Sequence, residues 1–537
     1  MQYLGRLAGA LGTANVPQNN APLRLLCEAR CRKPTLGKRY ARACGPRRRQ
    51  AQRDCSRQTS LRRCCGTAAA GVFTPVPGLR LNAHAICYPD PMTTTYPLHA
   101  TLTPADEPFP DTADVVIAGA GIMGCAAAYY LARRGLKAVV LDKSRIAGQQ
   151  STRAWGFVRQ QGREAAEVPL MMASIGMWAQ LETELNFDLE WRQGGCLYAA
   201  TDERDWTSFQ QWMDVARQYG LDTRKLDRAQ IDAHVTGMQG AALGALYTPS
   251  DGQAEPRRVA PAFAARAVEA GARFFEGCGV LDIERAGGAI AGVVTERGTI
   301  RTRHFICAAG ASSWQLLAAL GIALPQQTVR GTCMRTNALP LVTATAFWGG
   351  SVGIRQRANG TINLADEMQV DVDMTLGHLR ALSWFLPELW TQRESFSFHL
   401  NDAFARDLCD RVPGIVPARE RVLHPRDPQP QPNRAHAPRA LHKLRTLFPA
   451  LKDAQVVEAW GGLIDVLPDG IPVIDAPSQI GGLLVATGFC GHGFAMGPIV
   501  GRLLAEWIDD GQPSLDLAAF RLRRFADGTT QRPRNML

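Results

Sequence analysis

The chain has 537 residues, 46% of them hydrophobic and 20% charged, which is the composition of a globular protein of several domains. The net charge of +11 does not indicate a nucleic-acid partner, because residues 1–91 hold sixteen Lys and Arg against three acidic residues, which leaves the remainder close to neutral. Seven of the 14 cysteines also lie in that first segment, and the other seven are scattered singly. This pattern argues against a disulfide framework and predicts a reducing compartment, the cytoplasm. No uninterrupted apolar stretch has membrane-spanning length, so we predict no transmembrane segment.

Residues 1–111 are predicted to form a basic N-terminal extension that is disordered or not part of the native protein. Three interpretations stay open. The pairs Cys27/Cys31 and Cys64/Cys65 allow a zinc module, although their spacings match no standard finger. The Arg-rich, acid-poor composition is compatible with an organelle transit peptide. Met92 opens a Thr-rich lead into the first strand and would be a sensible natural start.

The first predicted element is a buried parallel strand at 115–118, followed by the motif Gly119-x-Gly121-x-x-Gly124. The first Gly permits a tight turn, the second lets the backbone approach a pyrophosphate, and the third lets the next helix pack on the strand. That helix, 122–134, precedes a second strand at 138–141, which ends where an acidic side chain would accept ribose hydroxyls. These parts predict a dinucleotide site without choosing FAD over NAD. Its candidate residues are Gly119, Ala120, Gly121, Ile122, Met123, Gly124, Asp142 and Lys143.

Further segments follow in chain order. A loop at 148–159 is rich in small and polar residues and ends in Arg159. A helix is predicted at 259–270, a strand at 273–280 and a further buried strand at 304–310. Near the end, the segment 460–474 precedes a strand at 482–488, a glycine-rich turn and a helix at 498–509.

Together these segments resemble the FAD-dependent oxidoreductase family that contains D-amino-acid oxidase, glycine oxidase and sarcosine oxidase, from about Asp114 to Asp510. The resemblance implies FAD as the cofactor. It also implies that the loop 148–159 contacts the flavin, that Val280 contacts adenine through its backbone, and that the C-terminal helix points its N-terminus at the flavin pyrimidine. The residues that it adds to the cofactor site are Ser151, Thr152, Arg153, Val280, Gly310, Gly488, Gly491, His492, Gly493 and Phe494.

The implied fold class is α/β, with a discontinuous Rossmann-like FAD-binding domain interleaved with an α+β substrate domain whose sheet is mostly antiparallel. We expect the FAD-binding domain to comprise 112–185, 250–325 and 455–512. The substrate domain comprises 186–249 and 326–454, and 513–537 form a C-terminal tail. Residues 425–438 are predicted to be an extended Pro-rich loop. We expect the histidines in or beside it to be solvated and not metal ligands, and we predict no metal site; they are His424, His436 and His442.

The reaction implied by the resemblance is oxidation of the C–N bond of a small amine or amino acid, with hydride transfer to flavin N5 and hydrolysis of the resulting imine. Arg159 stands where related enzymes bind the substrate carboxylate, although bonding to a neighbouring loop is an equal alternative. Arg355, on a predicted strand, and His492, between two glycines, are the other candidate catalytic residues. Several amino-acid-oxidising members carry an arginine where this chain has Ile464, and the adjacent Asp465 could attract a cationic amine.

Two other functions stay open: a non-catalytic FAD-binding assembly factor, and the flavoprotein subunit of a multi-subunit dehydrogenase. The expected partners are a small amine or amino acid and either oxygen or an electron-acceptor partner. We expect non-covalent FAD, because Cys333 aligns with a plain strand and not with an attachment site.

Overall fold

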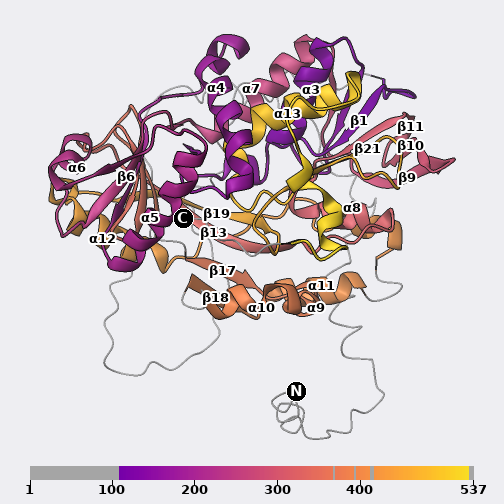
Figure 1. Ribbon diagram of the computed structural model, residues 1–537. Coiled ribbons are helices and arrows are strands. Elements are labelled where there is room, and N and C mark those ends of the chain that lie inside the picture. Colours follow the sequence, from indigo (N-terminus) through magenta and orange to yellow (C-terminus); the bar gives the residue numbers. More distant parts are fainter. Residues whose placement is uncertain (1–107, 367–368, 392–394, 412–415, 531–537) are drawn as a thin grey trace, which may run out of the picture. The chain divides into compact units, whose positions relative to one another are not determined.

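The computed structural model describes residues 108–366, 369–391, 395–411 and 416–530 (Figure 1). All of them belong to one compact unit, Tyr88–Leu537. The interpretations of residues 1–91 as a zinc module, a transit peptide or a segment before the true start lie outside the described residues and stay predictions. In the described part of the chain, no helix is long and apolar enough to cross a membrane.

A six-stranded sheet, in the order β20-β21-β12-β1-β2-β8, forms the centre of the nucleotide-binding part. Five of its strands are parallel: β1 (Val115–Ala118), β2 (Ala138–Leu141), β8 (Arg273–Phe275), β12 (His304–Cys307) and β21 (Leu483–Thr487). The edge strand β20 (Val473–Asp475) pairs antiparallel with β21. Strands from distant parts of the chain therefore meet in one sheet, which confirms the predicted α/β, Rossmann-like class.

The two faces of this sheet lie in separate hydrophobic cores, because successive side chains of a strand point to opposite faces. Val115 and Ile117 share a core with α3 (Ile122–Arg133), α7 (Pro256–Glu269) and α13 (Gly493–Asp509), against which α4 (Val168–Leu185) also packs (Figure 1). Val116 and Ala118 share the other core with β9 (Val280–Ala286), β10 (Ala289–Thr295), β11 (Gly298–Arg301) and α8 (Ser313–Ala319). Burial on both faces explains why these strands are continuously apolar.

The second sheet runs in the order β18-β17-β13-β16-β15-β14-β4-β6-β5, with β19 alongside β13. Its strands are β4 (Cys196–Ala200), β5 (Arg224–Leu226), β6 (Gly244–Thr248), β13 (Gln327–Thr336), β14 (Ala346–Gly349), β15 (Val352–Gln356), β16 (Ile362–Asp366), β17 (Val370–Asp373), β18 (Phe396–His399) and β19 (Val456–Val466). Only the pairs β4/β14 and β17/β18 are parallel among its described pairings, so the prediction of a mostly antiparallel sheet is confirmed.

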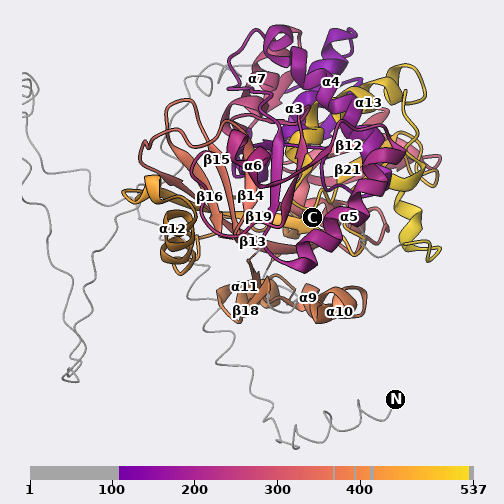
Figure 2. The same cartoon turned by 60° about the vertical axis from the view of Figure 1, so that its left-hand side comes forward.

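Six helices accompany the second sheet. α5 (Glu203–Gln218), α6 (Arg228–His234) and α12 (His436–Leu447) pack against its strands. A separate group, α9 (Leu376–Arg380), α10 (Leu382–Thr391) and α11 (Asp402–Arg411), lies beside β17 and β18 in both views (Figures 1 and 2).

The three stretches predicted for the FAD-binding domain supply the strands of the six-stranded sheet. In the third stretch, 455–512, only the part from β20 onward contributes strands to that sheet. The first strand of this stretch, β19, pairs with the whole of β13 and so extends the second sheet. A short ladder of β3 (Phe157–Val158) and β7 (Gly252–Gln253) joins the first two stretches. We propose the predicted domain boundaries with two changes, the transfer of residues 455–466 to the substrate domain and of 513–530 from the tail to the FAD-binding domain.

Two predicted elements differ in extent. The strand predicted at 273–280 is two strands, because Gly277 turns the chain with φ +61° between β8 and β9. The helix predicted at 498–509 begins at Gly493, and Pro498 lies inside it. A proline in the second turn of a helix removes only one backbone hydrogen bond, so the helix can begin before Pro498.

The C-terminal segments are more closely packed than predicted. α12 begins inside the predicted loop 425–438, and His436 is buried with its Nδ1 3.4 Å from Asp366 Oδ2, so the prediction that it is solvated is wrong. In the predicted tail, Phe520 and Leu522 are buried in the two cores of the six-stranded sheet. Residues 513–530 therefore pack with the folded body.

Candidate active site

A cavity of about 910 Å³ lies at the carboxyl ends of β1 and β2 and extends to the second sheet. Ligands of open α/β sheets bind at this end of the strands. Most of the predicted site residues line it: Gly119, Ala120, Gly121, Ile122, Met123, Asp142, Lys143, Ser151, Arg153, Arg159, Val280, Gly310, Gly491, His492, Gly493 and Phe494. Four predicted residues are not among those that line it, namely Gly124, Thr152, Gly488 and Arg355.

Close approach of the backbone requires the glycines of the first turn. Gly119 has φ +103°, and a Cβ there would stand 2.3 Å from the carbonyl O of Ala308. A Cβ on Gly124 would stand 1.9 Å from Gly119 O, so Gly124 packs α3 against the turn and does not face the cavity. Gly121 is the N-cap of α3, whose first turn holds no acidic residue. The helix N-terminus therefore presents a glycine-lined cradle suited to an anion.

Asp142 ends β2 at the edge of the cavity. Its Oδ2 accepts the Ala120 N–H at 2.8 Å and its Oδ1 accepts the Ser144 N–H at 2.7 Å, which fixes the carboxylate beside the glycine turn. Burial raises the pKa of Asp142, and these hydrogen bonds oppose the rise. Each oxygen keeps a second lone pair that can accept a ribose hydroxyl. The neighbouring Lys143 donates to Ser312 Oγ at 2.9 Å, and burial lowers its pKa to about 8.

The loop that follows β2 connects to both α3 and β19. Ser151 Oγ accepts the N–H of Ile122 at 2.8 Å. Thr152 donates its hydroxyl to the Ala147 carbonyl at 2.8 Å and does not line the cavity, so its contact with the cofactor stays a prediction. Arg153 lines the cavity but donates to the Gly461 carbonyl at 2.8 Å, which ties the loop to β19.

His492 sits at the N-terminus of α13 and faces the cavity. Its Nε2 lies 2.7 Å from Glu167 Oε1, and both side chains are buried. Burial lowers the pKa of His492, and Glu167 partly opposes that effect. Burial alone would raise the pKa of Glu167, but His492 and then Arg163 outweigh it, so the pKa of this carboxyl is lowered. The direction of both shifts gives a neutral imidazole beside a carboxylate at physiological pH.

Asp465 organises the loops around α13 through neutral donors. Its Oδ1 accepts from Gln150 Nε2 at 2.8 Å, and its Oδ2 accepts from Gln326 Nε2 at 3.0 Å and from the Gly488 N–H at 2.8 Å. Gly488 does not line the cavity, but its N–H group positions the Asp465 carboxylate, which does. Asp465 lines the cavity and its Oδ1 accepts a single hydrogen bond, so the attraction of a cationic amine by this carboxylate stays a prediction. Ile464 lines the cavity where related enzymes carry an arginine.

Two arginines line the end of the cavity next to β4. Arg159 stacks over the ring of Tyr198, with its guanidinium carbon 5.1 Å from the ring centroid, and donates to the Gln161 carbonyl. Arg163, four residues later, also lines the cavity and is 4% exposed. Sequence reasoning missed Arg163, Tyr198 and Glu167. The spacing of the two arginines was a usable signal, whereas nothing local links Glu167 to His492, 325 residues away.

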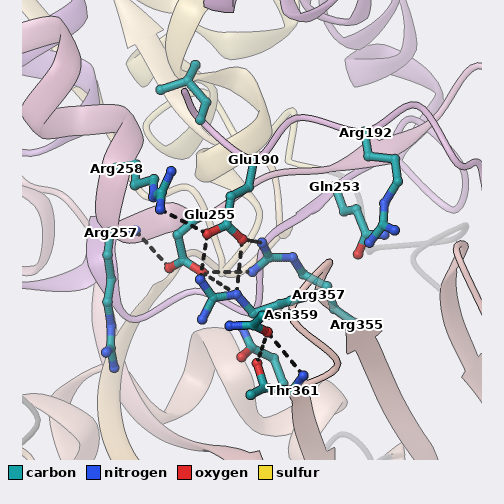
Figure 3. Close-up of polar contacts among 12 residues, drawn as sticks. Glu190, Arg192, Gln253, Glu255, Arg257, Arg258, Arg355, Arg357, Asn359 and Thr361 are labelled. Atoms are coloured by element: carbon teal, nitrogen blue, oxygen red, sulfur yellow. Dashed lines mark hydrogen bonds and ion pairs between the residues drawn. The ribbon is translucent and has the colours of Figure 1, made fainter. Parts of the chain in front are cut away.

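Arg355 is not part of the cavity wall. It is fully buried in an ion-pair cluster, with NH1 3.2 Å from Glu255 Oε2 and NH2 3.5 Å from Glu190 Oε2 (Figure 3). Arg357 pairs with both of these carboxylates, and Arg258 pairs with Glu190. Its charge is compensated by protein carboxylates, so the prediction that Arg355 binds substrate is wrong, and its role is to join β15 to the start of α7.

Apolar side chains form the remaining cavity wall. Trp155 and Trp348 line it and stack with ring centroids 5.2 Å apart. Cys333 also lines it, and burial raises the pKa of its thiol to about 12, which supports the expectation that it is unreactive. Across the described ranges, no group of three or more His, Cys, Asp or Glu side chains could hold a metal ion.

These residues fit FAD. The glycine turn at α3 suits a diphosphate, since Gly119 and Gly121 line the cavity where the N-terminus of the helix meets it and no acidic side chain lies in the first turn. Asp142 is fixed by hydrogen bonds at the position where a ribose would bind. The N-terminus of α13 lines the same cavity, as does Ser151. Two helix N-termini facing one long, partly apolar cavity are the arrangement expected for a dinucleotide whose ring accepts electrons.

A Rossmann-like sheet, a large antiparallel sheet and this shared cavity are the architecture of a flavin-dependent oxidoreductase. The chain belongs to the FAD dependent oxidoreductase family, DAO, whose sequence profile matches residues 114–507. The predicted family, the predicted FAD cofactor and the predicted oxidoreductase class are confirmed by this match.

Known proteins of this kind are similar over most of the described body. Human mitochondrial sarcosine dehydrogenase is 24% identical over 438 residues, which cover 80% of this chain and 43% of that protein. Glycine oxidase of Geobacillus kaustophilus is 24% identical over 420 residues, covering 76% and 97%. Among solved structures, L-amino acid deaminase from Proteus vulgaris has a TM-score of 0.73 at 24% identity, covering 78% of this chain and 99% of that one. The chain thus spans less than half of human sarcosine dehydrogenase.

Proposed function

We propose that this chain oxidises the C–N bond of a small amine or amino acid with FAD as electron acceptor, and that Arg159 binds the substrate carboxylate. The observation that carries the proposal is that Arg159 and His492 line the same cavity as the glycine turn of the dinucleotide site. The oxidation removes two electrons and two protons from the CH–NH unit, as a hydride from carbon to the flavin and a proton from nitrogen, and water then hydrolyses the imine to a carbonyl compound and an amine. When bound, FAD supplies the two-electron acceptor.

Arg159 is suited to hold a carboxylate in one orientation. Its contacts with the Tyr198 ring and the Gln161 carbonyl orient the guanidinium, whose planar fork binds a carboxylate through two N–H groups. The stacked Trp155 and Trp348 nearby make the wall apolar, so the bound substrate is shielded from water.

His492 is proposed to orient the substrate amine. Because burial lowers its pKa, with Glu167 opposing, the ring is neutral, and the carboxylate of Glu167 is best paired with a protonated Nε2. In that tautomer Nδ1 is an acceptor, which can take a hydrogen bond from an amine N–H. The N-terminus of α13 supplies a positive dipole end where negative charge would develop.

The test is an anaerobic screen in which purified holoprotein is mixed with glycine, sarcosine, other amino acids and secondary amines while flavin absorbance is followed. We expect bleaching with at least one carboxylate-bearing amine. The Arg159→Ala variant should keep its FAD and show a KM for that substrate raised on the order of 100-fold. The matched control is Arg217→Ala, on the exposed face of α5, which should behave as the wild type.

Other outcomes separate the alternatives. A protein that retains FAD but is bleached by no amine would favour a non-catalytic assembly factor. If a substrate is found, oxygen consumption with and without an artificial acceptor distinguishes an oxidase from a dehydrogenase subunit that passes electrons to a partner. A KM unchanged in Arg159→Ala would remove Arg159 from the substrate site.

We also propose a reducing, cytoplasmic location. Six of the seven cysteines after residue 91 are free thiols, which supports this proposal, whereas Cys409 is disulfide-bonded; the free thiols are Cys125, Cys196, Cys278, Cys307, Cys333 and Cys490. Fractionation of the native host with a specific antibody would test it.

A further inference from the structure

Arg163 is a buried cation in the cavity wall whose guanidinium makes no ion pair with a described carboxylate. Five arginines of the described part are buried, and four of them bond to acceptors from the protein. Arg257, Arg355 and Arg524 pair with carboxylates, and Arg153 donates to backbone carbonyls. For Arg163, no hydrogen bond or ion pair of the guanidinium to any described residue is present, and its Nε is fully buried without an acceptor.

The two carboxylates nearest to Arg163 are already engaged elsewhere. Glu167 bonds to His492 at 2.7 Å, and Asp251 accepts the backbone N–H groups of Gln160 and Gln161. Burial, followed by the repulsion of Arg159, lowers the pKa of Arg163 to about 9, so the side chain is still charged at neutral pH. An unpaired buried charge is unfavourable, and an incoming anion would remove the penalty.

From this arrangement we infer that Arg163 binds a second acidic group of the substrate, so that the preferred substrates are amines carrying two carboxylates. The inference rests on the proposed function in what it says about the reaction, whereas the binding of an anion by Arg163 does not depend on that function. Arg159 holds one carboxylate and Arg163 the other, and both side chains line the end of the cavity that Tyr198 also borders. Each guanidinium can bind one carboxylate through two N–H groups.

One carboxylate would not satisfy this end of the cavity. Glu167 bonds to His492 and Asp251 accepts two backbone N–H groups, so neither carboxylate makes an ion pair with Arg163. A substrate with one carboxylate could bind only one of the two guanidinium groups through two N–H groups. A dianion could give each guanidinium a carboxylate and relieve the repulsion between them.

Matched pairs of substrates that differ by one carboxylate test the inference. Iminodiacetate is compared with sarcosine, and N-methylaspartate with N-methylalanine, by anaerobic flavin reduction in the holoenzyme. We expect kcat/KM to be at least about 10-fold higher for the dicarboxylic member of each pair. In Arg163→Met, kcat/KM for the dicarboxylic member should fall on the order of 100-fold and that for the monocarboxylic member should change less than about threefold. Arg163→Lys should lie between them, and Arg217→Met on α5 is the control.

A binding measurement decides the case without turnover. Malonate and acetate are titrated into the resting holoenzyme, and flavin absorbance and the melting temperature are followed. Malonate should bind and stabilise the wild type more than acetate does, and Arg163→Met should lose this difference while melting at a higher temperature than the wild type in anion-free buffer. Arg163→Lys, which keeps the charge, reports on folding if the Met variant is unstable.

Several results would overturn the inference: equal kcat/KM within the substrate pairs, equal losses for both members in Arg163→Met, or malonate binding that is insensitive to Arg163. If no amine reduces the flavin but malonate binding depends on Arg163, the anion site stands and the proposed oxidation fails. If monocarboxylic amines reduce the flavin and malonate binds no better than acetate, the oxidation stands and the dicarboxylate inference fails.

Discussion

Substitution of Gly124 by Ala is the sharpest test of the cofactor site, because the perturbation has a known size. A Cβ at this position would stand 1.9 Å from Gly119 O, whereas carbon and carbonyl oxygen approach to about 3.3 Å, so α3 must move by about 1.4 Å from the turn. Overpacking of this kind costs about 1–3 kcal/mol. The better helix propensity of Ala returns about 1 kcal/mol, so the free energy of unfolding should fall by up to about 2 kcal/mol.

FAD affinity should fall by more than stability does. A shift of α3 displaces the N–H groups at its first turn, and one lost hydrogen bond to a charged phosphate costs about 1.5–3 kcal/mol. This is about 10- to 150-fold in the Kd for FAD. The measurement is titration of deflavinated protein with FAD by flavin fluorescence, together with urea unfolding.

The matched control is Gly176→Ala, in the exposed part of α4, where nothing lies within 4 Å of the added Cβ. It should leave FAD binding unchanged and raise the free energy of unfolding by up to about 1 kcal/mol. A Gly124→Ala variant that binds FAD as tightly as Gly176→Ala does would refute the assignment of this turn to the diphosphate.

Arg355→Met should lower the free energy of unfolding by about 3–5 kcal/mol, because it leaves Glu255 buried without its main partner. The control is Arg523→Ala at an exposed position, which should change the free energy of unfolding by less than about 0.5 kcal/mol. A change in KM without loss of stability in Arg355→Met would contradict a structural role for Arg355. Burial raises the pKa of Asp251 from 3.8 to about 7, so its contribution to stability is lost as the pH rises through that range. The stability of Asp251→Asn relative to wild type, from urea unfolding at pH 5 and pH 8, should therefore be more favourable at the higher pH, and an equal difference at both would count against the raised pKa. Acid precipitation should release all the flavin into the supernatant, because Cys333 is a buried thiol with a pKa near 12, and colour retained in the pellet would show covalent attachment.

The parts of the fold that could be predicted depend on local sequence. The strand at 115–118, the three glycines and the helix after them lie within twenty residues, so the apolar run and the required turn conformation identify them without knowledge of the rest. The split of 273–280 into two strands was missed because it depends on a single turn residue, Gly277. The start of α13 was missed because Pro498 suggests that the helix begins there, whereas the helix begins at Gly493 and contains Pro498.

Partner choice across the chain could not be predicted. Arg159 and Arg355 are both strand or loop arginines in the sequence, and only the fold shows that the second is neutralised by Glu255, one hundred residues away. Arg163 lies in a loop and Glu167 ends the short 3-10 helix Ala165–Glu167, and their importance follows from His492 and the cavity wall, which tertiary packing brings against them. Burial and long-range pairing, not residue type, separated the functional arginines from the structural one.

The stacked indoles of Trp155 and Trp348 give this protein a built-in optical signal. Their emission depends on the polarity of the cavity that they border, and a bound isoalloxazine ring absorbs in the range where tryptophan emits. Entry of a cofactor or a small anion should therefore register as a change in intrinsic fluorescence, without a dye or a coupled enzyme. A library of unlabelled compounds could be screened against the unmodified chain before its natural substrate is known, and replacement of Trp348 by Phe would identify which part of the signal arises at the wall.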